Sequence, residues 1–169
     1  MSPFMGGVAE TVDYSYFDRA RLHEPKVLLF QTPVGMNGKS ALETNMMMGG
    51  QLPAPQKFSV ERIRASLLKG SALDMVPLSA FDPQWSRTTY DLRIGRKLYN
   101  GGDLLSIVDP ILVSPTQTKE AREKLRPRLK YPLPIECGEW MAVEVYTQTP
   151  ADDLWIQVNL DGILERAVQ

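Results

Sequence analysis

Cysteine and histidine are almost missing from this 169-residue sequence, which contains one of each. The single cysteine, Cys137, excludes a disulfide within the chain, and no secretory signal pattern opens it, so we expect a reducing compartment. The single histidine, His23, leaves no second imidazole for a metal-ligand set and is typical of a surface residue rather than of a hydrolase triad. These shortages argue against a histidine-based triad and against a metal site built from Cys and His. We expect a protein that is not an enzyme and that has neither a cofactor nor a metal.

An excess of charge of one sign is also missing. The 19 Lys and Arg residues nearly balance the 20 Asp and Glu residues, and the two signs are mixed along the chain. Nucleic-acid-binding proteins usually carry a basic arm or stripe, because each phosphate contact depends on Lys or Arg. We therefore expect no direct contact with nucleic acid.

Long apolar runs are absent too, since the longest, such as the one in residues 26–31, falls far short of the about 20 residues that span a bilayer. The sequence therefore predicts a soluble protein. A chain of this length can bury roughly 70% of its unfolded surface in one domain, so it needs no disulfide or metal to hold a core.

Proline and glycine, by contrast, are plentiful, and the 13 prolines and 12 glycines divide the chain into short segments typical of sandwiches and barrels. Alternation of polar and apolar residues then predicts the strands, which lie at 26–32, 56–68, 90–98, 139–147, 154–160 and 163–168. Turns are predicted at Asn100-Gly101-Gly102 and at Asp161-Gly162. The runs 139–147 and 154–160 indicate either a hairpin or neighbouring strands of facing sheets.

Two local features refine this pattern. The alternation in 56–68 slips by one residue near Glu61, as a β-bulge would cause. Residues 116–126 (TQTKEAREKLR) have threonine caps and a following proline, so they predict one short surface helix. The fold class expected is all-β: an antiparallel sandwich, specifically a single jelly roll of about eight strands, with residues 1–25 as an N-terminal arm and 26–169 as the domain.

One motif suggests a different chemistry. Residues 33–40 (PVGMNGKS) follow an apolar run as a phosphate loop follows its strand, and Lys39 and Ser40 are the residue types that bind phosphate and Mg²⁺. The first glycine of that motif is Pro33, which has no N–H to offer. Residues 104–109 resemble a strand that ends in a metal-binding aspartate, but no β-α-β rhythm supports the pair, so a plain glycine turn is favoured.

The acidic residues near Cys137 could be imagined as the paired acids of a glycosidase. Glu139, however, differs in strand parity from both Glu136 and Glu144, so neither combination would share a face. We expect these carboxylates to be solvated. Cys137 lacks an activating base or a metal-ligand set and is expected to be a small core or edge residue.

Two apolar clusters are candidates for assembly contacts. Three consecutive methionines cannot all face one core in a strand, and methionine adapts well to contact surfaces. Aromatics at alternating spacing near the N-terminus could anchor an arm either on the body of the same molecule or on a neighbour, and the neighbour is slightly favoured. The predicted contacts are Tyr14, Tyr16, Phe17, Met46, Met47 and Met48.

Two stretches, residues 44–60 (TNMMMGGQLPAPQKFSV) and 158–166 (VNLDGILER), resemble jelly-roll capsid proteins of icosahedral bacteriophages, particularly those with an internal membrane. The resemblance covers most of the chain from Thr44 onward, as pattern more than as identity. It implies a structural protein of the virion, made in the host cytoplasm, that assembles with itself and with other capsid proteins. A membrane surface is a further partner that it implies.

Two alternatives stay open at this point. In a lectin-like or receptor-binding sandwich, the aromatic residues Trp85, Trp155 and Tyr99 would lie on loops and stack on sugar rings. In a nucleotide-binding protein, the degenerate phosphate loop would use Lys39.

Overall fold

The computed structural model describes residues 9–76, 83–108 and 128–167. The helix predicted at 116–126 and the aspartate at position 109 lie outside these residues. The described chain is mostly antiparallel β-structure with very little helix, so the all-β prediction is confirmed.

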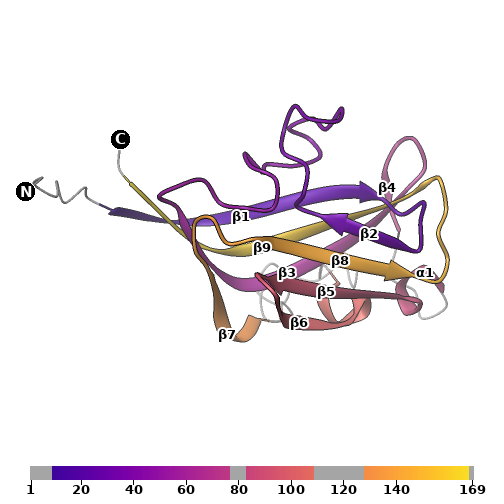
Figure 1. The fold of residues 1–169 in the computed structure, drawn as a ribbon. Coiled ribbons are helices and arrows are strands. Elements are labelled where there is room, and N and C mark those ends of the chain that lie inside the picture. Colours follow the sequence, from indigo (N-terminus) through magenta and orange to yellow (C-terminus); the bar gives the residue numbers. More distant parts are fainter. Residues whose placement is uncertain (1–8, 77–82, 109–127, 168–169) are drawn as a thin grey trace, which may run out of the picture.

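The strands form two sheets. The strands of the five-stranded sheet are β1 (Ala9–Arg21), β9 (Leu154–Ala167), β3 (Lys57–Lys69), β4 (Asp74–Met75) and β7 (Arg128–Ile135). Their order is β1-β9-β3-β4, and β7 also pairs with β3. Those of the four-stranded sheet, in the order β2-β8-β5-β6, are β2 (Lys26–Leu29), β8 (Met141–Thr147), β5 (Thr88–Ile94) and β6 (Lys97–Asp103). A short helix α1 (Pro83–Ser86) and a 3-10 helix η1 (Leu104–Ile107) complete the described elements (Figure 1).

Alternation of side chains creates the core between the sheets. In β8, Met141, Val143 and Val145 are fully buried, and in β9 the inward residues from Leu154 to Leu160 are buried in the same way. Removing each such side chain from water stabilises the fold by about 1.5–3 kcal/mol. Because β8 and β9 belong to different sheets, the runs 139–147 and 154–160 are strands of facing sheets and not a hairpin.

The predicted β-bulge is present, because the register of β3 shifts between Val60 and Arg62 against both β7 and β9. The predicted turn at Asp161-Gly162 is wrong. β9 continues through these residues, with Gly162 opposite the bulge, where a Cβ atom would lie 1.9 Å from the carbonyl oxygen of Ser59. This glycine serves a close approach of two strands and not a turn.

The turn predicted at Asn100-Gly101-Gly102 is wrong for a similar reason. These residues lie inside β6, and β5 and β6 are joined at Gly95, whose φ is +59°. A Cβ at Gly101 would lie 2.5 Å from the carboxylate of Asp91 on β5. The sequence pattern does not support the resemblance of 104–109 to a strand, and residues 104–107 form the 3-10 helix η1.

The predicted N-terminal arm needs a correction as well. Residues 9–21 form β1, which pairs with β9 along its whole length, from Ala9 opposite Ala167 to Arg21 opposite Trp155. The described part of the arm is therefore an edge strand of the larger sheet. Apolar side chains on its inner face, such as Tyr16, bury themselves in the core, which a detached arm would leave in water.

Candidate assembly surface

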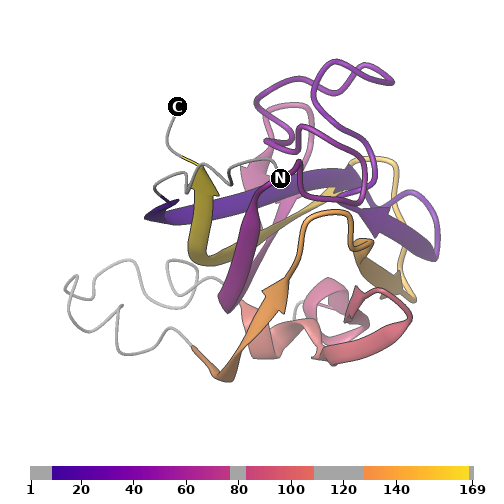
Figure 2. The same ribbon diagram turned by 60° about the vertical axis from the view of Figure 1, so that its left-hand side comes forward.

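The connection between β2 and β3 is the longest irregular segment that the structure describes, and we call these residues, 30–56, the protruding loop. It rises above β1 and β2, on the opposite side of the molecule from α1 and β6 (Figures 1 and 2). Long loops without secondary structure are uncommon in compact domains, and those that occur are frequently functional.

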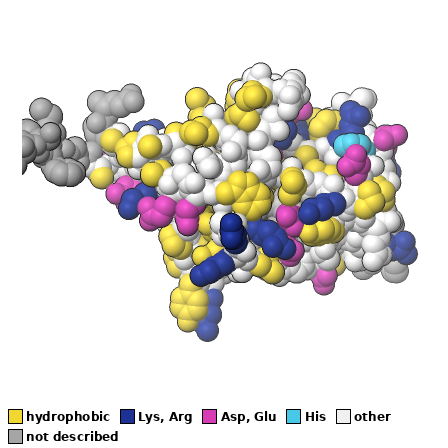
Figure 3. Space-filling view, viewed as in Figure 1, with side chains coloured by type: hydrophobic (Ala, Val, Ile, Leu, Met, Phe, Trp, Pro, Cys, Tyr) yellow, Lys and Arg dark blue, Asp and Glu magenta, His cyan; other side chains and the backbone are white. Residues whose placement is uncertain are grey.

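Exposed apolar side chains are concentrated on this loop, and Figure 3 shows hydrophobic atoms at its tip. It carries five of the eleven large hydrophobic residues that are most exposed in the described chain. We call these five residues the apolar loop surface: Val34, Met36, Leu42, Met47 and Met48. Leu42 and Met47 are exposed to 80% and 74%, so a substantial apolar area faces water here.

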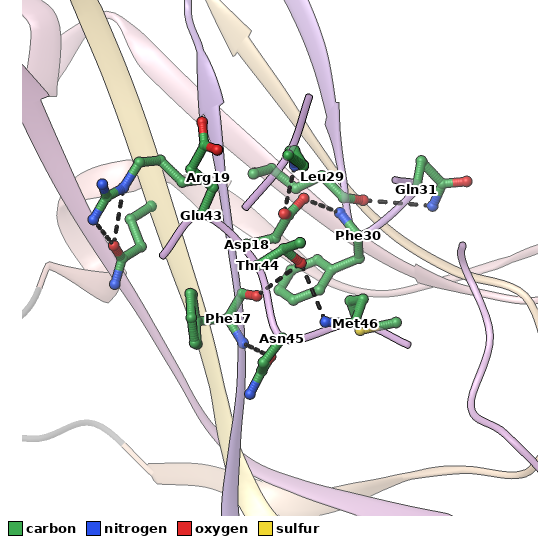
Figure 4. Close-up of polar contacts among 12 residues, drawn as sticks. Phe17, Asp18, Arg19, Leu29, Phe30, Gln31, Glu43, Thr44, Asn45 and Met46 are labelled. Atoms are coloured by element: carbon green, nitrogen blue, oxygen red, sulfur yellow. Dashed lines mark hydrogen bonds and ion pairs between the residues drawn. The ribbon is translucent and has the colours of Figure 1, made fainter. Parts of the chain in front are cut away.

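A buried carboxylate fixes the loop to the sandwich. Asp18 on β1 is completely buried, and its Oδ2 accepts a hydrogen bond of 2.5 Å from the backbone N–H of Phe30, where the loop begins (Figure 4). Its Oδ1 lies 2.5 Å from Nζ of Lys39, in the middle of the loop. Burial raises the pKa of Asp18 above its usual value, and the bonds from Lys39 and Phe30 oppose this increase.

Asn45 provides a second attachment, to the outer edge of β1. Its Oδ1 accepts a hydrogen bond of 2.8 Å from the N–H of Phe17, and its own N–H donates to the carbonyl oxygen of Phe17. Its Nδ2 donates to the carbonyl oxygen of Ser15 at 2.7 Å. The N–H of Arg19 donates to the carbonyl oxygen of Glu43 at 2.7 Å. Residues 43–45 thereby cover the edge of β1 from Ser15 to Arg19. Figure 4 shows Asn45 beside Phe17.

The third attachment joins the loop to β8. The N–H of Gly50 donates to the carbonyl oxygen of Phe30 at 2.7 Å, and the N–H of Met141 donates to the carbonyl oxygen of Gly50 at 2.8 Å. The Gln31 side chain donates to the carbonyl oxygen of Met141 and accepts from Nε1 of Trp140. Gly50 has a φ of +67° and lies so close to Trp140 that a Cβ atom would be 3.0 Å away, so glycine suits this position best.

The six residues predicted as assembly contacts divide into two groups. Met46 and Tyr16 belong to the core, with exposed fractions of 1% and 4%, and so cannot meet a partner in this fold. Tyr16 packs edge-on against Phe58 and Tyr14, because its parity in β1 directs it inward. The remaining four are accessible at least in part: Tyr14, Phe17, Met47 and Met48.

Sequence reasoning missed the other members of the apolar loop surface, Val34, Met36 and Leu42. A detectable signal was available, since each is an apolar residue in a segment rich in Gly, Asn, Ser and Glu. The anchoring role of Asp18 and Asn45 had no such signal, because it depends on where the loop meets β1.

The phosphate-loop motif has the geometry of a turn. The N–H of Gly35 donates to the carbonyl oxygen of Lys39, and Gly35 and Gly38 have φ values of +84° and +77°. Residues 41–43 form a turn and not the helix into which a phosphate loop leads. The Lys39 ammonium binds Asp18 and is therefore engaged within the fold.

The acidic residues near Cys137 are engaged in local contacts. Glu136 lies 3.1 Å from Nζ of Lys57, and its N–H donates to the carboxylate of Glu139. Glu144, on β8, is nearly buried and accepts a hydrogen bond from the Tyr146 hydroxyl, which lowers the pKa of the carboxyl group. Glu136 and Glu139, the pair expected to be solvated, are both exposed, so this prediction is confirmed.

The remaining chemical candidates are surface residues. His23 is exposed, as expected, and lies 3.6 Å from Glu24. Cys137 is exposed in the turn between β7 and β8, so the expectation of a core position is wrong. In residues 9–76, 83–108 and 128–167, no group of three or more His, Cys, Asp or Glu side chains could hold a metal ion. No helix in those ranges is both long enough and apolar enough to cross a membrane.

The three aromatic residues of the lectin-like alternative are dispersed. Trp85 is completely buried in α1, so its predicted place on an exposed loop is wrong. Tyr99 is exposed on β6, and Trp155 lies on β9 in the other sheet, with the guanidinium of Arg21 4.9 Å from its ring centre.

Comparisons with protein-family models, with curated proteins and with solved structures found no match.

Proposed function

We propose that this protein is a structural subunit of an icosahedral phage shell, made in the host cytoplasm and assembled with copies of itself and with other capsid proteins. The observation that carries the proposal is the apolar loop surface, held above the sandwich by three sets of buried or partly buried hydrogen bonds. Because these bonds already fix the loop, association costs little backbone entropy, and the burial of exposed apolar side chains favours contact with a neighbour.

The order of the strands supports a jelly roll. Without the two-residue β4, the larger sheet has the order β1-β9-β3-β7 and the smaller sheet β2-β8-β5-β6. A jelly roll arises when a long antiparallel ribbon folds over itself, which pairs the first strand with the last, the second with the one before it, and so on inward. The pairs β1·β9, β2·β8, β3·β7 and β5·β6 follow this rule. Jelly rolls are common in viral capsids, although the fold alone does not determine a function.

The charge balance supports a position away from the genome. With 19 basic and 20 acidic residues, the chain has no surplus of cations for phosphates. The proposal therefore places the subunit in a shell that a membrane or another layer separates from nucleic acid.

Light scattering across a concentration series tests this function. We expect the purified protein to form large or symmetric oligomers, because the apolar loop surface leaves water on association. The double substitution Leu42→Ser and Met47→Ser should lower the mass at equal concentration. Tyr131→Ser is the matched control, since Tyr131 is 69% exposed but lies on β7, and it should leave the mass unchanged. A wild-type protein that stays monomeric at high concentration would contradict the proposal.

A second candidate, a glycan-binding sandwich, is favoured by one observation. A groove of about 570 Å³ lies between the protruding loop and the turns at 70–73 and 152–153, with Trp155 in its wall. Polar side chains beside an aromatic ring suit a sugar. A glycan screen with wild type and Trp155→Ala tests it: binding that the substitution abolishes supports the candidate, and no binding rejects it.

A further inference from the structure

The outer edge of β1 has two halves: the protruding loop covers residues 15–19, and residues 9–13 have no such cover among the described residues. The register with β9 is constant from Ala9 to Arg21, so N–H and C=O groups of alternate residues point toward β9 and away from it. The bonds from Ser15, Phe17 and Arg19 to residues 43–45 show that these odd-numbered positions point away from β9. The same alternation directs the backbone groups of Thr11 and Asp13 outward.

The cover of this edge ends at Ser15. Among the described residues, no group bonds the outward N–H or C=O of Thr11 or Asp13. Figure 1 shows that this end of β1 and the paired end of β9 extend together beyond the four-stranded sheet. An open edge of this kind is a template for another strand, and natural proteins normally block it.

The other edges of the sandwich are less suited to pairing. β7 contains Pro132 and Pro134, which have no N–H to donate. β2 has only the four residues Lys26–Leu29. β6 contains Gly101 and Gly102, and its register against β5 shifts by one residue, so it is irregular. β4 has only the two residues Asp74–Met75, so the open half of β1 is the longer regular, proline-free edge of the larger sheet.

We propose that the open half of β1 pairs antiparallel with the same segment of a second copy, with Thr11 on the twofold axis. The inference rests on the proposed function for the presence of neighbouring copies, and it names the contact by which two of them join. The larger sheets of the two copies would then continue into one another through backbone hydrogen bonds.

The cover at Ser15 selects the register. Since its carbonyl oxygen already binds Asn45, the new ladder can use the outward groups of residues 9, 11 and 13. Thr11 then faces Thr11, Ala9 faces Asp13, and Glu10 faces Val12. No like charges lie directly opposite each other, and facing threonines are a favourable pair in antiparallel sheets. A shift of two residues in one direction would place Ala9 opposite Ser15, whose carbonyl group is occupied. A shift of two residues in the other direction would place Glu10 opposite Glu10, which like charges disfavour.

Site-directed cross-linking tests the register. Residues that exchange both hydrogen bonds across an antiparallel pair have Cα atoms about 5.5 Å apart, within the range of a disulfide. Thr11→Cys, introduced into a Cys137→Ser background to remove the exposed native thiol, should form covalent dimers under mild oxidation. Asp13→Cys in the same background should not link to itself but should link to Ala9→Cys when the two proteins are mixed.

A pair of substitutions at one position tests the backbone contact separately. Thr11→Pro removes an outward N–H, whereas Thr11→Ala keeps it, and neither breaks a bond to β9. We expect Thr11→Pro to dissociate the twofold pair in light scattering and Thr11→Ala to leave it intact.

Failure of this inference is distinguishable from failure of the proposed function. If wild type forms large oligomers but Thr11→Cys does not link and Thr11→Pro assembles normally, the inference is wrong and the shell function stands. If Thr11→Cys links into dimers and nothing larger forms, the edge contact stands and the shell function is wrong. A Thr11→Cys variant that links to another polypeptide and never to itself would overturn the second copy as the occupant.

Discussion

Two aspartates of the larger sheet bind cations in very different surroundings. Asp18 is completely buried, and its partner Lys39 keeps 17% of its side chain exposed. Asp161, in β9, keeps 23% of its side chain exposed and binds the guanidinium of Arg64 through two hydrogen bonds of 2.6 and 2.9 Å. The pKa of Asp18 is raised and that of Asp161 is lowered.

The difference shows which effect dominates at each place. At Asp18, the loss of hydration outweighs the attraction of Lys39. The folded state therefore disfavours the charged form of the Asp18 carboxyl group, although it holds that group in a fixed position. At Asp161, burial also favours the neutral acid, but Arg64 and a hydrogen bond from Ser15 outweigh it. The first pair therefore fixes the position of the protruding loop, and the second contributes stability.

Breaking the buried pair should have the largest effect. Lys39→Ala leaves the Asp18 carboxylate buried without its cation, which should lower the free energy of unfolding by about 3 kcal/mol or more. Urea denaturation followed by fluorescence measures it.

The double variant Asp18→Asn with Lys39→Met is the matched control, because it removes both charges. It should be clearly more stable than Lys39→Ala alone. Equal losses in the two proteins would contradict the expectation that the unpaired buried carboxylate causes the loss in Lys39→Ala.

Breaking the pair at Asp161 should cost less. Asp161→Asn keeps the size of the side chain but removes the charge that Arg64 binds, and we expect a loss of about 1–2 kcal/mol. Thermal and urea unfolding give the value. A loss as large as that of Lys39→Ala would contradict the ranking by burial.

Lowering the pH should change the contributions of the two aspartates to the free energy of unfolding in opposite directions. The folded-state pKa of Asp161 is depressed, so its contribution is complete above its unfolded-state pKa, near pH 4, and is lost as the pH falls through the folded-state value. The folded-state pKa of Asp18 is raised, so its protonation stabilises the fold as the pH falls.

Unfolding free energies between about pH 6 and about pH 2 test this difference. Asp161→Asn should lose less stability in acid than wild type does. The variant with Asp18→Asn and Lys39→Met should lose more, because the opposing effect of Asp18 is gone. Parallel curves for all three proteins would show that other groups govern the acid response.

The smallest effect should come from an exposed pair on the same sheet. Glu10 on β1 lies 3.2 Å from Arg166 on β9, and their side chains are 41% and 47% exposed. Glu10→Gln should change the free energy of unfolding by about 0.5 kcal/mol or less, and less still in high salt. A loss above that of Asp161→Asn would overturn the comparison.

Much of the fold could be predicted because alternation is local. The apolar residues Val143 and Val145 alternate with their neighbours in sequence, and this alone predicts that they are buried. The slip of the alternation near Glu61 predicts the bulge in the same way. The turns at Gly101 and Gly162 were mispredicted because glycine can signal either a turn or a close approach. Which one applies depends on Asp91 or Ser59 in the partner strand, and the local sequence does not show this.

The candidate surface was only partly predictable for the same reason. Met47 and Met48 were identified from composition, but Met46 faces the core because Asn45 fastens the loop to β1 in one orientation. The contact of Asp18 with Lys39 joins residues 21 positions apart, so it has no helical or strand periodicity to reveal it.

The place of β9 between β1 and β3 also has a consequence for biosynthesis. β1 leaves the ribosome well before its partner strand, which consists of residues 154–167. β3 pairs with the same strand, so the larger sheet cannot close until residues 154–167 have been synthesised. Until then the apolar side chains on the inner faces of β1 and β3 are exposed and can aggregate. We therefore expect this protein to depend on chaperones that hold nascent chains.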